Sequence, residues 1–206
     1  MTGEMPAACR FIAVVGGSGS GKSWLARRLH AALGEKAAHL YLDDFYRDLG
    51  HLPEADRGKV NFDDPAAIDW DSLRQVIETL QRDENASIPS YDFATHLRNG
   101  TRELPAPRIL VMEGLWLLHP EWLRDVFSVS VFVECSAEER LRRRVERDVL
   151  ERGRSRESIM QQFSEHVQPM HLQFVEPQRV LADRVVNSPV TDEEFAALVE
   201  VCSPAL

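Results

Sequence analysis

The spacing of apolar residues predicts alternating strands and helices along the chain. Short continuous apolar runs, which are typical of buried parallel strands, lie at residues 11–15, 39–42, 108–114, 128–134 and 183–186. Between the first two runs, apolar residues recur at helical spacing and predict a helix from Lys22 to about Leu33, with Gly34 as its stop. This alternation predicts an α/β fold, a parallel sheet flanked by helices.

Further helices are expected after the second strand and at the end of the chain. One begins at Asp64-Pro65, with the proline in its first turn, and continues to Gln81. Residues 155–181 carry helical patterning that Pro169 and Pro177 are expected to interrupt. A capping box from Thr191 to Glu194 opens a final helix to about Val201.

A helix rich in arginine is expected to open at Ser136. Its predicted buried face consists of Leu141, Val145 and Val149. The same register places on exposed or partly exposed faces Arg140, Arg143, Arg144 and Arg147.

The pattern of residues 88–104 predicts an extended hairpin with its turn at Asn99-Gly100. Between two strand–helix units, such a hairpin is an insertion, at about residues 86–105, that can lie over a substrate. We expect one domain over residues 1–206, with this insertion and a lid at about residues 147–160.

The segment after the first strand fits the phosphate-binding loop pattern of glycine, four residues, glycine, lysine and serine or threonine. Its members are Gly16, Gly17, Ser18, Gly19, Ser20, Gly21, Lys22 and Ser23. A flexible turn is the alternative, but a chance match has a probability on the order of one per cent at a glycine content of about 7%. The motif predicts ATP or GTP as ligand, with Lys22 at the β- and γ-phosphates and Ser23 on Mg²⁺.

Carboxylates follow two of the predicted strands, at the sheet edge where open α/β folds bind ligands. Asp43 and Asp44 follow the strand at residues 39–42, and Glu113 ends the strand at 108–114. An arbitrary Asp pair is usually a turn former or a cap, but the phosphate loop on the same edge favours chemistry. Glu113 stands where phosphate-loop enzymes place the acidic residue that holds Mg²⁺ or its water.

Composition and charge narrow the range of partners. The 206 residues carry a formal charge of −9, which argues against a general binder of nucleic acids or membranes. Residues 140–156 nevertheless hold eight arginines and no lysine, and guanidinium groups match phosphate oxygens. Three widely spaced cysteines and the lack of an apolar stretch of ~20 residues indicate a reduced, cytoplasmic protein.

Several motifs occur together in one order: GGSGSGKS at residues 16–23, DDFYRD at 43–48, NFDDPAAID at 61–69, YDFATH at 91–96, MEG at 112–114 and RRRVERDVLERGR at 142–154. With them, residues 10–187 resemble the uridine kinase (uridine/cytidine kinase) family, within the phosphoribulokinase and uridine kinase group of P-loop kinases.

The resemblance implies transfer of the γ-phosphoryl group of ATP to the 5′-hydroxyl of uridine or cytidine in pyrimidine salvage, with Mg²⁺. Asp43 matches the catalytic carboxylate, and Arg147, Arg152 and Arg154 match arginines near the phosphates. The positions that match substrate-binding residues are Tyr46, Asp63, Tyr91, Phe93, His96, Arg144 and Gln162. The family's tetramer makes a homo-oligomer one expectation, and Asp44 stands where the family has a small hydroxyl residue.

Two other functional hypotheses are also consistent with the phosphate loop. In the first, the chain phosphorylates another small alcohol, such as a phosphosugar, pantothenate or a different nucleoside, and the aromatic hairpin residues hold no pyrimidine. In the second, the chain is a nucleotide-dependent switch whose arginine-rich helix docks a protein partner, because a phosphate loop alone does not separate these classes.

Overall fold

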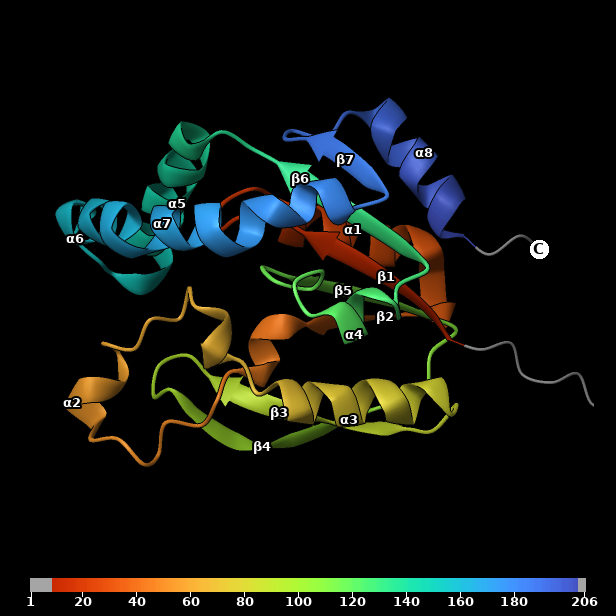
Figure 1. The fold of residues 1–206 in the computed structure, drawn as a ribbon, viewed down its shortest axis with the longest axis horizontal. Helices are drawn as coiled ribbons and strands as arrows, with labels where there is room; N and C mark the ends of the chain where they lie inside the picture. The colour runs from red at the N-terminus through yellow and green to blue at the C-terminus, as the bar shows by residue number, and fades with distance from the viewer. Residues whose placement is uncertain (1–8, 204–206) are drawn as a thin grey trace, which may run out of the picture.

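Five parallel strands form the centre of the computed structural model, which describes residues 9–203 apart from the side chain of Arg152 (Figure 1). Their order across the sheet is β2-β5-β1-β6-β7. The strands are β1 (Arg10–Val15), β2 (Ala37–Tyr41), β5 (Ile109–Gly114), β6 (Val129–Glu134) and β7 (Arg184–Asn187). Because every pairing in this sheet is parallel, the carboxyl ends of the strands meet at one edge. The predicted α/β class is confirmed.

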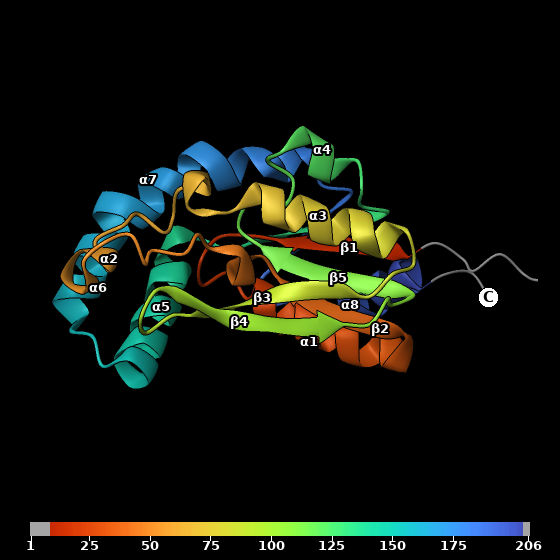
Figure 2. The same cartoon turned by 90° about the horizontal axis from the view of Figure 1, so that it is seen from below.

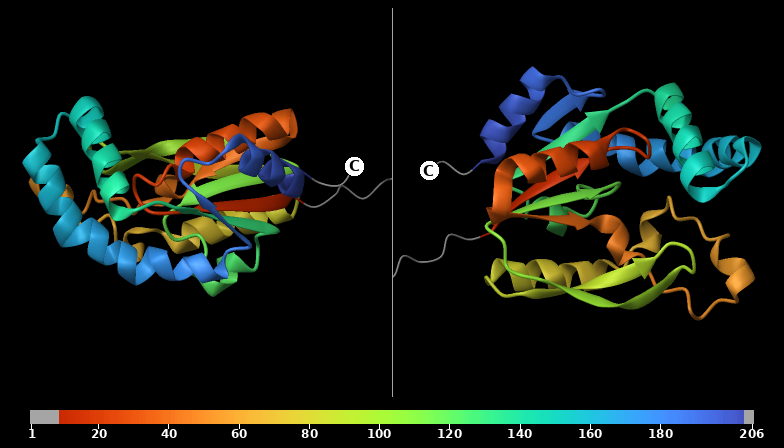
Figure 3. Two further views of the ribbon diagram at one scale, coloured as in Figure 1. Left: turned by 90° about the horizontal axis from the view of Figure 1, so that it is seen from above. Right: turned by 180° about the vertical axis from the view of Figure 1, so that it is seen from behind.

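Helices cover both faces of the sheet, as Figures 2 and 3 show. On one face, α3 (Trp70–Gln81) and α4 (Glu121–Arg124) share a core with alternate residues of β1. On the other face, the remaining β1 residues pack against α1 (Lys22–Leu33) and α8 (Asp192–Cys202). Both α1 and the capping box of α8 lie where the sequence predicts them. Within the described range, no helix has the length and apolar character needed to cross a membrane.

The helix predicted from Asp64 begins later than expected. Asp64 caps only a single 3₁₀ turn, Pro65–Ala67, where its Oδ1 accepts the N–H of Ala66 at 2.8 Å. The α-helix starts at Trp70, after Asp69 Oδ1 accepts the N–H of Ser72 at 3.2 Å. The second aspartate therefore provides the true N-cap. The short helix α2 (Glu54–Arg57) lies within the preceding irregular segment.

The hairpin consists of β3 (Ala86–Asp92) and β4 (Leu97–Leu104), so the predicted turn at Asn99-Gly100 is wrong. The chain reverses at residues 93–96, because the Asp92 carboxylate accepts the N–H of Ala94 and the hydroxyl of Thr95, both at 2.8 Å. His96 closes the turn with φ 58°, and its N–H donates to the Asp92 carbonyl at 2.8 Å. The hydrogen bonds of Asp92 therefore determine the position of the turn, although Asn-Gly is a strong turn signal in the sequence.

A long helical arm follows β6 and lies beside the carboxyl edge of the sheet (Figure 1). It consists of α5 (Ala137–Arg152), α6 (Arg156–Gln162), α7 (Gln168–Met170) and intervening π and 3₁₀ segments to Leu181. The prolines do not interrupt it as predicted, since π segments precede both Pro169 and Pro177 and shift the hydrogen-bond register.

The buried face of α5 also differs from the prediction. Arg140 and Arg144 are 1% and 6% exposed, whereas Val149 is 42% exposed. Arg140 donates to Gln168 Oε1 at 2.7 Å and Arg144 to Ser18 Oγ at 2.9 Å. Because these acceptors come from distant parts of the chain, the helix turns two arginines inward and leaves an apolar residue outside.

Candidate active site

The phosphate loop connects the end of β1 to the start of α1. Gly19 and Gly21 have φ angles of 81° and 96°, in the left-handed region that favours glycine. The loop is closed by the N–H of Ser20, which donates to the Gly17 carbonyl at 3.0 Å. Gly21 is the N-cap of α1 and provides no side-chain cap, so the N–H groups at the start of this helix can serve an anion.

Ser23 and Glu113 meet at the start of α1 and the end of β5. The Ser23 hydroxyl donates to Glu113 Oε2 at 2.5 Å, and Glu113 is 4% exposed. His39 Nε2 lies 3.9 Å from Glu113 Oε1, but burial lowers the pKa of His39 to about 4, so the imidazole is neutral. A hydroxyl and one carboxylate suit Mg²⁺, which completes its shell with water and phosphate oxygens. Among the described residues, no group of three or more His, Cys, Asp or Glu side chains could hold a metal without such help.

Asp43 and Asp44 lie in a 3₁₀ turn, Leu42–Phe45, directly after β2. Arg102 of the hairpin donates to Asp44 Oδ2 at 2.9 Å. Burial raises the pKa of Asp44, and this ion pair opposes the rise. The pair explains how the chain accommodates a second carboxylate beside Asp43, and it commits Asp44 to holding the hairpin.

Asp63 is brought to the same edge by the segment before α3. Burial raises the pKa of its carboxyl, while the charges of Arg144 and Lys22 oppose the rise, followed by those of His166 and Arg147. The structure therefore gathers the loop lysine, two arginines of α5 and Asp63 within electrostatic reach of one another.

Arginines of the predicted lid and Arg144 converge on one buried carboxylate. Asp148 is fully buried, and its Oδ1 accepts from Arg147 Nε at 2.8 Å. Its Oδ2 lies 3.6 Å from Arg144 Nε and 3.8 Å from Arg154 Nη1. Arg144 and Arg154 also share Gln162 Oε1, at 2.9 and 2.6 Å. The side chain of Arg152, a further predicted lid residue, lies outside the described residues.

The predicted pocket residues Tyr46, Tyr91, Phe93 and His96 form one aromatic cluster with Phe62, which the sequence analysis missed. Phe62 stacks on His96 at a centroid distance of 4.6 Å and meets the Tyr46 ring edge-on at 5.3 Å. Tyr91 lies 5.2 Å from Phe93 and 5.5 Å from Tyr46. Burial, followed by the charge of Asp43, raises the pKa of Tyr46 well above its ordinary value, so its hydroxyl stays protonated and donates to the Phe62 carbonyl at 3.0 Å.

Arg98 of β4 joins the hairpin to the rest of the site and was also missed. Its guanidinium donates to Asp69 Oδ2 at 2.9 Å and to the carbonyls of Tyr46 and Phe45 at 3.0 and 3.2 Å. The hairpin is thereby fixed to the turn that carries Asp43.

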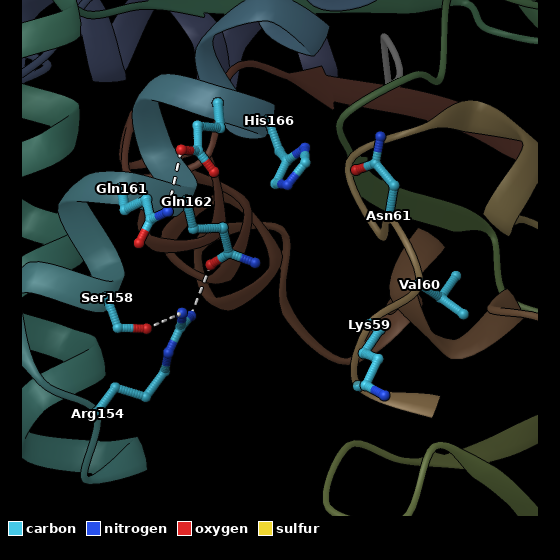
Figure 4. A pocket seen from close by; sticks show the side chains of 10 residues that line it. Lys59, Val60, Asn61, Arg154, Ser158, Gln161, Gln162 and His166 are labelled. Atoms are coloured by element: carbon cyan, nitrogen blue, oxygen red, sulfur yellow. Dashed lines mark hydrogen bonds between the residues drawn. The ribbon is translucent and has the colours of Figure 1, made fainter. Parts of the chain in front are cut away.

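A cavity of about 340 Å³ lies between α6 with its flanking residues and the segment before Asp63 (Figure 4). On one side, the cavity is lined by Arg154 before α6, Gln162 in α6 and His166 in the π segment after it. On the other side, the chain at Lys59 and Asn61 forms the wall. Of the predicted site residues, Arg154 and Gln162 line this polar cavity. In this wall, Asn61 belongs to the NFDDP motif, from which only Asp63 was predicted as a site residue.

A phosphate loop after the first strand, a hydrogen-bonded pair of Ser23 on α1 with Glu113 on β5, and a group of arginines around Asp148 are features of a P-loop kinase. The chain belongs to the phosphoribulokinase / uridine kinase family, whose model matches residues 11–193, and it is a phosphotransferase.

Named relatives and solved structures agree with this assignment. The chain is 39% identical over 176 residues to a uridine kinase of Halobacterium salinarum, covering 85% of this chain and 78% of the relative. It is 37% identical over 200 residues to a uridine kinase of Chloroflexus aurantiacus, covering 94% and 96%. The structure of a candidate fructose transport system kinase from Silicibacter sp. TM1040 is similar at a TM-score of 0.74 and 25% identity, covering 90% and 92%. A phosphoribulokinase from Rhodobacter spheroides, at a TM-score of 0.66 and 17% identity over 88% of this chain and 70% of that one, shares the fold.

Proposed function

We propose that the protein transfers the γ-phosphoryl group of ATP to the 5′-hydroxyl of uridine or cytidine, yielding UMP or CMP. The observation that carries this proposal is the aromatic cluster fixed beside Asp43 by Arg98, with Asp63 on the same edge. A pyrimidine nucleoside needs an aromatic surface for its base, an acceptor for its ribose hydroxyls and a base at its 5′-oxygen. Relatives named uridine kinase over most of the chain support the same acceptor.

The side chains divide into an acceptor side and a phosphate side. Asp43 orients the 5′-hydroxyl and accepts its proton, which a poor nucleophile requires. Asp63 accepts hydrogen bonds from the ribose hydroxyls, and the neighbouring charges of Arg144 and Lys22 counteract the burial that raises the pKa of Asp63. Among the rings, Phe93 is 53% exposed and offers a face to the base, while His96 provides a ring nitrogen that can discriminate pyrimidine from purine.

On the phosphate side, ATP would supply the phosphoryl group when bound, and Mg²⁺ would neutralise part of the phosphate charge. The backbone of residues 16–21 surrounds the phosphates, and Ser23 with Glu113 holds the metal or its water. Lys22, Arg147, Arg152 and Arg154 stabilise negative charge on the group in transfer.

The test is a coupled ADP-release assay with ATP and Mg²⁺. Uridine, cytidine, adenosine, ribulose 5-phosphate, pantothenate, fructose and glycerate are offered separately as acceptors. We expect turnover only with uridine and cytidine. Asp43→Asn should retain ADP binding and lose a factor of at least about 10² in kcat. Turnover confined to a sugar or to glycerate would overturn the acceptor, and unchanged kcat in Asp43→Asn would overturn the role of Asp43.

A further inference from the structure

A buried arginine lies directly behind the phosphate loop. Arg140 is 1% exposed, and its Nη2 donates to the neutral Oε1 of Gln168 at 2.7 Å. Its Nε and Nη1 are buried and have no hydrogen-bond partner in the described part of the chain. The guanidinium also lies 5.6 Å from the centroid of the Phe163 ring.

The loop backbone touches both the side chain and the main chain of Arg140. A Cβ atom built on Gly17 would lie 2.9 Å from Arg140 Nη1, and one built on Gly19 would lie 2.5 Å from the Arg140 carbonyl oxygen. Any side chain at these positions would collide with Arg140 or displace it. The guanidinium is therefore separated from the phosphate side of the loop by little more than the loop backbone.

Among the described residues, Cys135 and Glu176 are the groups whose negative charge would favour the guanidinium of Arg140, and burial raises the pKa of the Cys135 thiol. His171 Nδ1 would lie 2.8 Å from the same Gly17 Cβ, and burial, followed by the charge of Arg140, lowers the pKa of His171 to about 4. The imidazole is therefore neutral at pH 7. Glu176 is the carboxylate on this side, but it contacts the far nitrogen of His171, Nε2, at 3.1 Å and its side chain is 46% exposed.

A buried guanidinium in this setting opposes the stability of the protein without ligand. Burial lowers the pKa of Arg140, which means that the surroundings disfavour its charged form. An arginine nevertheless stays protonated in proteins, so the charge is held at a cost in folding free energy. Negative charge on the other face of the loop would offset this cost.

We propose that Arg140 is an electrostatic positioning residue for nucleotide binding, whose charge acts through the phosphate loop on the phosphates of the bound nucleotide. The inference rests on nucleotide binding at the loop, which the proposed function requires, but it is independent of the acceptor. It separates Arg140 from Lys22 and the lid arginines, which are expected to touch the phosphates. The proposal also explains why a glycine lies at position 17 close to Arg140, since a larger residue there would push the guanidinium away.

The test compares Mg-ADP affinity with stability in four proteins: wild type, Arg140→Met, Arg140→Lys and Arg142→Met. Met removes the charge at similar length, and Lys retains it. Arg142 is the matched control, because it lies on the same helix with a half-exposed side chain paired to Glu139 and Glu146. Isothermal titration calorimetry gives the Kd for Mg-ADP, and thermal unfolding gives Tm with and without it.

We expect Arg140→Met to raise the Kd for Mg-ADP by about tenfold or more, while its ligand-free Tm equals or exceeds that of the wild type. The Tm gain on adding Mg-ADP should shrink accordingly. Arg140→Lys should stay within about threefold of the wild-type Kd, as should Arg142→Met.

An unchanged Kd in Arg140→Met would overturn the proposal, as would an equal rise in Arg140→Lys, which would point to shape rather than charge. Failure of the wild type to bind Mg-ADP would also overturn it. If Arg140→Met does not fold, the ligand-free stability claim is refuted, and Arg140→Gln compared with Arg140→Lys then decides the affinity claim. A protein that binds Mg-ADP normally but phosphorylates no nucleoside would refute the acceptor alone.

Discussion

Replacing Asp148 with asparagine should both destabilise the protein and slow turnover. The carboxylate is fully buried, accepts one hydrogen bond from Arg147 at 2.8 Å and lies within 3.8 Å of guanidinium nitrogens of Arg144 and Arg154. Asparagine keeps the volume of the side chain and removes its charge. The substitution therefore tests the electrostatic role of Asp148 without creating a cavity.

The size of the loss follows from the exposure of Arg144, Arg147 and Arg154. Removing one member of a buried ion pair costs about 3–5 kcal/mol. Arg144 has a side-chain exposure of 7%, whereas those of Arg147 and Arg154 are 36% and 29%, so solvent screens part of their interaction. We therefore expect Asp148→Asn to lower the free energy of unfolding by the lower limit of this range, about 3 kcal/mol. For a domain of this size, that corresponds to a fall in Tm of roughly 6–12 °C.

Urea unfolding and a steady-state assay measure the two effects. Glu146→Gln is the matched control, since Glu146 lies on the same helix with a side-chain exposure of 58% and pairs with Arg142 at the surface, where a pair is worth about 1 kcal/mol or less. We expect Asp148→Asn to lower kcat more than it raises the KM for the nucleoside, because the arginines of the predicted lid would no longer be held in position to contact the phosphates. A loss of unfolding free energy no larger than that of Glu146→Gln, with kcat unchanged, would refute the role of Asp148.

Two further predictions concern groups whose pKa is shifted. Burial raises the pKa of Asp63, so the contribution of Asp63 to stability is fully present below the unfolded pKa and is lost as the pH rises through the folded pKa. Asp63→Asn should therefore increase the free energy of urea unfolding at pH 8 and weaken nucleoside binding in calorimetry. A variant that is less stable than the wild type at pH 8 would contradict this. Burial and Arg140 lower the pKa of His171 to about 4, so stability present above pH 6.5 is lost as the pH falls toward 4. His171→Gln should reduce the loss of unfolding free energy between pH 7 and pH 5 by about 2 kcal/mol, and an unchanged loss in urea titrations at the two pH values would show that His171 is protonated in the fold.

The parts of the fold predicted correctly from the sequence are those that local signals specify. The helix Lys22–Leu33 has its predicted bounds because the phosphate loop opens it and Gly34 ends it. The hairpin exists where it was expected, but its turn was misplaced, because Asp92 satisfies the backbone at residues 93–96 and leaves Asn99-Gly100 inside β4. The Asn-Gly dipeptide alone did not show that the Asp92 side chain would stabilise a different turn.

The burial of the α5 arginines could not be predicted from helical periodicity. Charged residues on a helix ordinarily face solvent, and the acceptors that bring them inside lie far away in sequence: Gln168 for Arg140, Ser18 and Gln162 for Arg144. Phe62 was overlooked for a related reason, since a single aromatic residue in a polar segment gives no periodic signal. In both cases, contacts with residues distant in sequence determine where the side chain lies.

The arginines around the phosphate loop differ in the partners that hold them, and we expect this difference to affect how the predicted lid works. Arg154 and Arg144 share the neutral amide oxygen of Gln162, and Arg144 also donates to the neutral hydroxyl of Ser18. A phosphate oxygen is a stronger, charged acceptor than either, so these hydrogen bonds can be exchanged for phosphate contacts with a gain in strength. We expect Asp148 to remain behind the guanidinium groups during such an exchange and to keep them together. We therefore expect the predicted lid to respond to the nucleotide while its charges stay organised, and Arg140, which is buried behind the loop, to keep its position.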